Sequence, residues 1–240
     1  LQIHARNKPI KDSIILKNVA RETFGFSGAH LESLTNEAAI LAMRENSEYI
    51  GEKHFSEAIN KVMLGEKLDR KPSNSERERV SIHESGHALI SEIINPGSVA
   101  SLTIIPRGGA LGFMRKSPQD DQYLYTRQEL ETQIMISLAG AMAEETKYGD
   151  RSTGARSDFK QAWDIAKEIV ESGISALGIV YSEAIPGETL YEECKSIIAN
   201  LEQKTLSILQ ENQDILYSIA DALIAAETLN RNQMVELINA

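Results

Sequence analysis

Residues 75–94 read SERERVSIHESGHALISEII, and this stretch decides how the rest of the chain is interpreted. Ser75 followed by Glu78 has the spacing of a capping box, which predicts that a helix begins here. The apolar positions recur at helical spacing and form one stripe: Val80, Ile90 and Ile94. We expect the helix to end before Asn95-Pro96-Gly97, which is a turn sequence.

Within this helix, residues 83–87 have the pattern H-E-x-x-H. Histidines four residues apart share one face of a helix, so the rings of His83 and His87 can both reach one metal ion at ~2.0–2.1 Å. Glu84 lies about a quarter turn away. It can instead take the proton of a water in the open coordination position. The motif therefore predicts a zinc-dependent hydrolase with Glu84 as the general base.

A catalytic zinc ion needs a third protein ligand, and no histidine follows His87. Asp158 falls in a helix expected over residues 155–171, on the same face as an apolar stripe. A carboxylate buried there would need a cation. Glu144 and Glu145 are alternatives, because a glutamate on the helix after the motif also completes some zinc sites. The spacing favours Asp158 and leaves the three candidates open.

The composition excludes several classes of protein. The 240 residues include 35 acidic and 25 basic side chains, and 25 − 35 gives a net charge of −10. This balance argues against non-specific binding to nucleic acid or anionic lipid. The hydrophobic fraction of 42% supports a real core and excludes global disorder. Cys194 is the only cysteine in the sequence, which excludes an intramolecular disulfide framework.

The rest of the chain is mainly helical by periodicity, with one small β element. Strands are expected over residues 99–105 and 110–114, separated by the turn sequence Pro106-Arg107-Gly108-Gly109. The polar stretch 65–74 resembles a linker. The other helices are expected at 13–22, from Ser27, from about Glu52, from the Thr126–Glu129 capping box to about 147, over 155–171, and from about 189 to the end.

Five motifs occur in register along the chain. They are RNKPI at 6–10, GFSGAHLESLTNEAAILAMRE at 25–45, HESGHAL at 83–89, IIPRGGALGF at 104–113 and STGARSDFKQA at 152–162. Together they resemble the FtsH-type family of membrane-anchored, ATP-dependent zinc metalloproteases. The resemblance covers almost the whole chain, as far as residue 238.

The resemblance implies a mainly α fold in two parts. Residues 1–66 would form the small helical lid subdomain of an AAA ATPase module, and residues 67–78 a linker. Residues 79–240 would form a mostly helical, zincin-type peptidase domain with a small β element. The zinc ligands of the family map onto His83, His87 and Asp158, with Glu84 as catalytic base and one zinc ion per chain.

The family's IIPRG strand borders the active-site cleft. We therefore expect four residues to bind substrate: Thr103, Ile104, Ile105 and Pro106. Pairing of an extended peptide with the edge of this strand would explain broad sequence tolerance, because main-chain hydrogen bonds do not read side chains. The alternative is that this segment is ordinary sheet.

The resemblance also implies what the intact protein does. Its partners would be unfolded or damaged protein substrates and further copies of itself in a homohexamer, and no nucleic acid. The sequence contains no G-x-x-x-x-G-K-[ST] loop, so ATP and Mg²⁺ would bind only in the intact protein. That protein would be anchored in a membrane, with this part on the cytoplasmic, matrix or stromal side.

The chain begins with Leu1 and has no apolar run near the ~20 residues of a membrane helix. We therefore expect a soluble fragment of a longer protein.

Two departures from the family pattern lie near the predicted site. Ser85 stands where the family usually has alanine, and Ser157 stands where it usually has asparagine before the aspartate. Ser85 is small, so we expect little effect, whereas Ser157 could alter a hydrogen bond near a ligand. Two non-catalytic alternatives remain open: a metal-free hexamerisation scaffold, and an adaptor that binds peptides on the 99–105 strand without cutting them.

Overall fold

The structure is a computed structural model, and it describes residues 1–11, 13–68, 72–117 and 122–239. The chain divides into two compact units. The first unit comprises Leu1–Lys71, Ile105–Leu111 and Lys116–Asp121, and the second comprises Pro72–Ile104, Gly112–Arg115 and Gln122–Ala240. Helices dominate both units and the described strands form one small sheet, which confirms the predicted mainly α fold class.

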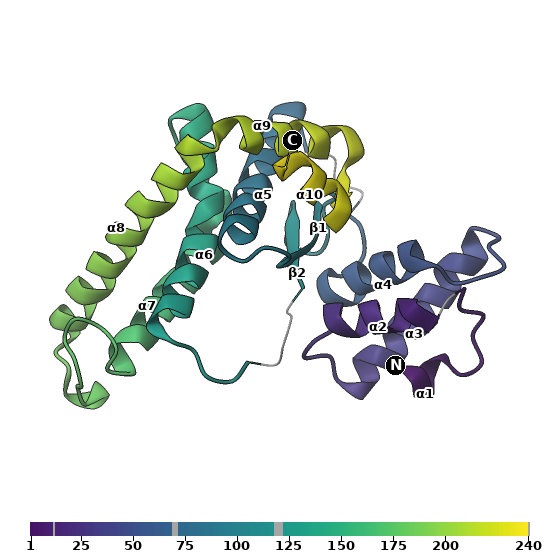
Figure 1. Ribbon diagram of the computed structural model, residues 1–240, viewed down its shortest axis with the longest axis horizontal. Coiled ribbons are helices and arrows are strands. Elements are labelled where there is room, and N and C mark those ends of the chain that lie inside the picture. The colour runs from purple at the N-terminus through teal and green to yellow at the C-terminus, as the bar shows by residue number, and fades with distance from the viewer. Residues whose placement is uncertain (12, 69–71, 118–121, 240) are drawn as a thin grey trace. The chain divides into compact units, whose positions relative to one another are not determined.

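The first unit is a small helical cluster (Figure 1). Its helices are α1 (Gln2–Ala5), α2 (Ser13–Glu22), α3 (Gly28–Arg44) and α4 (Glu52–Leu64). Ser27 caps α3 by accepting a hydrogen bond from the His30 N–H, which confirms the predicted start. The largest fully buried side chains of this unit form one core: Leu34, Ile50, Phe55 and Ile59.

The segment Ile105–Leu111 packs with the first unit. Its Arg107 side chain is buried and donates a 2.5 Å hydrogen bond to Glu57 on α4. The Leu68 N–H donates to the Pro106 carbonyl at 3.0 Å. The turn sequence between the two predicted strands is therefore held by side-chain and backbone contacts outside the sheet.

The second unit contains the longest of the described helices (Figure 1). Its helices are α5 (Asn74–Ile94), α6 (Arg127–Tyr148), α7 (Arg156–Glu171), α8 (Gly187–Glu211), α9 (Gln213–Ala226) and α10 (Arg231–Ile238), with 3₁₀ turns at Thr153–Ala155 and Ser182–Ala184. Helix α6 packs against α5, α7 and α8, and its apolar positions are buried around most of its circumference. The unit therefore has a single core in which α6 is central.

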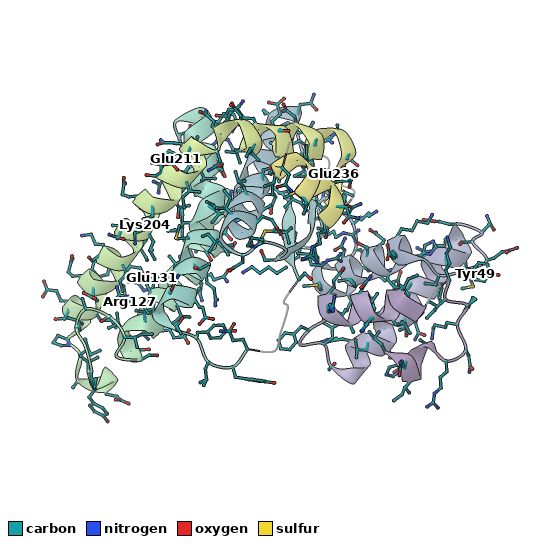
Figure 2. The ribbon with its side chains drawn as sticks, viewed as in Figure 1. Tyr49, Arg127, Glu131, Lys204, Glu211 and Glu236 are labelled. Carbon is teal, nitrogen blue, oxygen red and sulfur yellow. The ribbon has the colours of Figure 1, made fainter. Side chains whose placement is uncertain are left out.

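Two helix starts show how capping sets the boundaries. Thr126 and Glu129 form the predicted capping box of α6. Arg127 and Glu131 follow in the first turns, where they form a 2.7 Å ion pair on the surface (Figure 2). The predicted start of α5 was wrong by two residues, because Ser73 and Glu76 make the capping box there instead of Ser75 and Glu78.

Helices α5 and α6 approach closely at Gly86. A Cβ atom added at Gly86 would lie 2.5 Å from the Ala139 carbonyl oxygen and 2.5 Å from the Ala143 Cβ. A glycine in the middle of a helix costs about 1 kcal/mol relative to alanine. The close packing explains this glycine, since any side chain there would push the two helices apart.

The sheet has the strand order β2-β1-β3, with β1 at Val99–Thr103, β2 at Phe113–Lys116 and β3 at Thr228–Asn230. Strands β1 and β3 are antiparallel, and Thr103 lies opposite Thr228. The first strand ends two residues before its predicted end, and the second begins three residues after its predicted start. Strand β3 was not predicted, because three residues between two helices carry no alternating pattern of their own.

No helix in the described ranges is long and apolar enough to cross a bilayer.

Candidate metal centre

Three side chains from two helices converge on one point in the second unit. His83 and His87 are one turn apart on α5, and Asp158 lies in the first turn of α7. The ligand atoms of these three residues all lie within 4.8 Å of one another. Both histidines are buried, and the aspartate side chain is 23% exposed. The structure thus brings together the three residues predicted to bind the metal.

The distances fit a tetrahedral metal site. Nε2 of His83 lies 3.1 Å from Nε2 of His87, and Oδ2 of Asp158 lies 3.3 Å and 3.8 Å from these two nitrogens. Ligands at ~2.0–2.1 Å from a tetrahedral ion are themselves ~3.3 Å apart. Two imidazoles and one carboxylate are a donor set of catalytic zinc sites, which leave a fourth position open. The residues present therefore fit zinc.

The Nδ1 atoms of both rings, which lie opposite Nε2, have partners that fix the orientation of the rings. Nδ1 of His87 lies 2.6 Å from the Ile136 carbonyl oxygen, which can only accept, so this nitrogen carries a hydrogen. Nδ1 of His83 lies 2.8 Å from Oε1 of Glu144. In the neutral rings both Nε2 atoms are then bare lone pairs that face each other and the Asp158 carboxylate. Three acceptors this close would repel one another unless a metal ion or a proton lay between them.

Glu144 contacts Nδ1 of His83, on the side of the ring opposite the metal position. Its carboxylate accepts hydrogen bonds from Arg79 at 2.9 Å and from the backbone and side chain of Ser152 at 2.9 Å and 3.0 Å. Glu145 pairs instead with Arg151 at 2.6 Å. Both alternatives for the third ligand therefore lie away from the Nε2 atoms. Ser157 is exposed, and Ser152 makes the contacts near the site.

Gly140 on α6 leaves the space in front of the two rings. A Cβ atom added there would lie 2.5 Å from Nε2 of His83 and 2.6 Å from Nε2 of His87. Sequence reasoning missed this residue, although a glycine inside the otherwise regular pattern of α6 was an available signal. Since a methyl group would fill the place that an ion needs, Gly140 belongs to the metal centre.

Glu84 is buried next to this cluster, with only 7% of the residue exposed. Burial raises the pKa of its carboxyl group to about 7; the positive charge of His83 lowers that pKa and the negative charge of Asp158 raises it. A carboxylate with a pKa near neutral can both take up and release a proton at physiological pH. The position and the pKa suit the predicted role of general base.

Without a metal, the cluster binds a proton strongly. Burial lowers the pKa of His83, but hydrogen bonds to Asp158 and Glu144, with the charges of Glu84 and Asp158, raise it to about 10. Burial raises the pKa of Asp158, but the hydrogen bond from His83 and the charges of both histidines hold it below its usual value. The site therefore attracts positive charge.

The predicted substrate residues lie at the end of β1. Thr103 pairs with Thr228 in the sheet, and the Ile104 N–H donates to the Glu227 carbonyl at 3.0 Å. Strand β1 lies between β2 and β3, so it is not an edge strand of the described sheet, as pairing with substrate would require. Ile105 and Pro106 are half-buried within the first unit.

Comparison with known protein families agrees with this geometry. Residues 70–237 match Peptidase family M41, and residues 13–57 match the AAA+ lid domain. The M41 match contains every residue of the metal centre.

Individual relatives extend the similarity to nearly the whole chain. One is the ATP-dependent zinc metalloprotease FtsH of Aster yellows witches'-broom phytoplasma, 39% identical over 99% of this chain and 37% of its own length. Another is FtsH 2 of Thermoanaerobacter sp., 37% identical over 99% of this chain and 48% of its own length. FtsH of Bacillus subtilis is 38% identical over 100% of this chain and 41% of its own length.

The chain thus spans less than half the length of these relatives. The agreement in sequence confirms the resemblance to the FtsH-type zinc metalloproteases and the enzyme class that it implies. The chain belongs to peptidase family M41.

Proposed function

We propose that this chain is the zinc endopeptidase part of a longer ATP-dependent protease. His83, His87 and Asp158 would hold the zinc ion, and Glu84 would act as general base. The observation that carries the proposal is the convergence of three acceptor atoms at 3.1–3.8 Å, with both histidine Nδ1 atoms already engaged on the other side.

A zinc ion bound there supplies a Lewis acid that polarises the scissile carbonyl and lowers the pKa of water nearby. The protein's own groups do the rest. Glu84 takes the proton of the attacking water and delivers it to the leaving amine. Glu144 and the Ile136 carbonyl keep the two imidazoles in the required tautomer and orientation.

An extended polypeptide is the substrate that we propose. Residues 103–106 remain our proposed contact segment, on the strength of the family motif. Because β1 lies between β2 and β3 and ends at Thr103, a peptide would have to contact mainly residues 104–106, which follow the strand. A substrate bound through its backbone would be selected for being unfolded more than for its sequence.

For the intact protein we propose ATP-driven degradation of unfolded or damaged proteins by a homohexamer at a membrane. Residues 1–66 would be the ATPase lid, 67–78 the linker and 79–240 the peptidase domain. The AAA+ lid match and the FtsH relatives support this proposal. ATP and Mg²⁺ would bind to parts outside this chain, and the chain would lie on the cytoplasmic, matrix or stromal side.

The test uses the purified chain loaded with zinc, with casein as an unfolded substrate. We expect one zinc ion per chain by metal analysis, new peptide termini, and anomalous scattering at the zinc edge between His83, His87 and Asp158. Glu84→Gln should keep the zinc and lose cleavage by a factor of at least ~100. A chain that takes up no zinc would favour the scaffold, and a zinc-loaded chain that binds casein without cutting it would favour the adaptor.

A further inference from the structure

Gly112, the residue before β2, lies directly against the side chain of Glu84. A Cβ atom added at Gly112 would lie 2.7 Å from both Cγ and Oε1 of Glu84, and 2.7 Å from Cγ1 of Val80. Carbon atoms in contact are normally ~3.5–4.0 Å apart. No side chain therefore fits at position 112 while Glu84 keeps its present position.

The requirement for glycine here is one of space. Among the described residues seven other glycines have a positive φ angle, and Gly112 is not one of them, so its backbone is one that other residues can adopt. Val80 and Glu84 are one turn apart on α5, and the Gly112 backbone packs on the face that they share. The glycine thus allows the chain before β2 to contact the buried base directly.

Helix α5 makes a second close contact, this one with α6. Gly86, two residues after Glu84, packs against the backbone at Ala139. Helix α5 is therefore fixed by one glycine contact to α6 and one to the chain before β2. The Glu84 side chain is buried, with 7% of the residue exposed, and the Gly112 backbone limits its rotation on one side.

We propose that Gly112 is a positioning residue for Glu84, because its backbone holds the carboxylate at the metal centre and its missing side chain leaves the carboxylate room there. This inference rests on the proposed role of Glu84 as general base. Proton transfer needs the base within ~2.6–3.2 Å of the reacting water. A displacement of about 1 Å can lower the rate of a reaction ~100-fold.

The test is Gly112→Ala, with Gly109→Ala as the matched control. Position 109 lies three residues earlier in the chain, and a Cβ added there has no atom within 4 Å. Metal content, kcat and KM are measured on a fluorogenic peptide. Gly112→Ala should keep one zinc ion per chain and a KM within about twofold, while kcat falls ~10–100-fold. Gly109→Ala should match the wild type, and an equal kcat in the two variants would overturn the proposal.

The methyl group added at position 112 would also contact Val80. A substitution at Val80 therefore distinguishes an effect on the position of Glu84 from an effect on packing. The double variant Val80→Ala/Gly112→Ala removes that contact and leaves the one with Glu84. It also removes one source of steric conflict, which helps if Gly112→Ala alone unfolds. We expect its kcat to stay ~10–100-fold below that of Val80→Ala alone. A kcat restored to the level of Val80→Ala would show that packing explained the loss, and would overturn the proposal.

A binding measurement gives a readout that needs no turnover. A peptide hydroxamate binds the zinc ion, and its hydroxyl group donates to the base. Gly112→Ala should weaken this binding ~10-fold in the wild type and leave it unchanged in a Glu84→Ala background, as expected for coupled residues. Equal losses in both backgrounds would overturn the proposal. Wild-type cleavage by Glu84→Gln would instead overturn the proposed function itself.

Discussion

Glu144 lies behind the imidazole of His83, with its Oε1 atom 2.8 Å from Nδ1, on the side of the ring opposite the metal position. It is 1% exposed and also accepts hydrogen bonds from Arg79 and Ser152. Burial raises the pKa of Glu144, but the hydrogen bonds from His83, Arg79 and Ser152 hold it below its usual value. A carboxylate that stays ionised there fixes the His83 ring with Nε2 facing the metal.

Glu144→Gln should weaken zinc binding without abolishing it. The amide keeps only one acceptor oxygen for donors on three residues, so the His83 ring would lose part of its support. We expect zinc affinity to fall ~10–100-fold, as for other groups that orient metal ligands. Competition with a calibrated chelator measures this.

Two further variants make that measurement specific. Asp158→Asn removes a ligand, so it should weaken zinc binding more than Glu144→Gln does. Glu145→Gln is the matched control, because the neighbouring carboxylate pairs with Arg151 near the surface and should leave affinity unchanged. Unchanged affinity in Asp158→Asn would return Glu144 and Glu145 as candidates for the third ligand.

Gly140→Ala should remove the metal from a folded chain. The added methyl group would lie 2.5–2.6 Å from the Nε2 atoms of both histidines, and neither ring can retreat from its partner on Nδ1. We expect less than one tenth of the wild-type zinc content by metal analysis. Gly187→Ala, at the open start of α8, should keep full zinc content. A normal zinc content in Gly140→Ala would contradict our placement of the ion.

The metal-free chain should lose stability as the pH rises from about 6.5 to 10. The pKa of His83 is raised in the folded chain from 6.5 to about 10, so the proton that it holds stabilises the fold fully below pH 6.5. That stabilisation is lost as the pH rises through the folded value. Thermal unfolding of the chelator-treated chain at several pH values measures this.

The zinc-loaded chain should not show this decline, because the ion replaces the proton on His83. Zinc binding at pH 8 should accordingly release about one proton, which calorimetry in buffers of different ionisation enthalpy detects. A melting temperature of the metal-free chain that is flat or rising over this range would contradict the proton-binding cluster.

Ser85→Ala should stabilise the chain. Ser85 is fully buried, and its Oγ atom has no hydrogen-bond partner among the described residues. Replacing it removes the cost of an unpaired buried hydroxyl group and introduces a better helix former, so the free energy of unfolding should rise by about 1 kcal/mol. Urea denaturation measures the change.

Ser81 provides the opposite control on the same helix. Its hydroxyl group is buried as well, but it donates a 2.7 Å hydrogen bond to the Ala220 carbonyl. The Ala220 carbonyl lies inside α9, so Ser81→Ala removes an additional hydrogen bond to it and should lower the free energy of unfolding by about 1 kcal/mol. A loss of stability in Ser85→Ala would mean that its hydroxyl group has a partner after all.

The sequence predicted well whatever depends on neighbours along the chain. The caps at Ser27 and Thr126 were placed correctly, because a capping side chain bonds to the backbone three residues away. The cap of α5 was misplaced because two serine–glutamate pairs with the same spacing overlap at its start. Strand β3 could not be predicted, since it forms by pairing with β1, more than 120 residues earlier.

The sequence by itself determined that His83 and His87 face the same way and that Glu84 lies beside them, because one helical turn imposes that geometry. Only the tertiary structure decided that Asp158 lies beside the two Nε2 atoms while Glu144 lies at Nδ1 of His83, because their places depend on how α6 and α7 pack in the unit that contains α5. The same packing gave Gly112 and Gly140 their significance. A glycine has no functional group, and these two matter because a side chain at either position would overlap Glu84 or the two histidines.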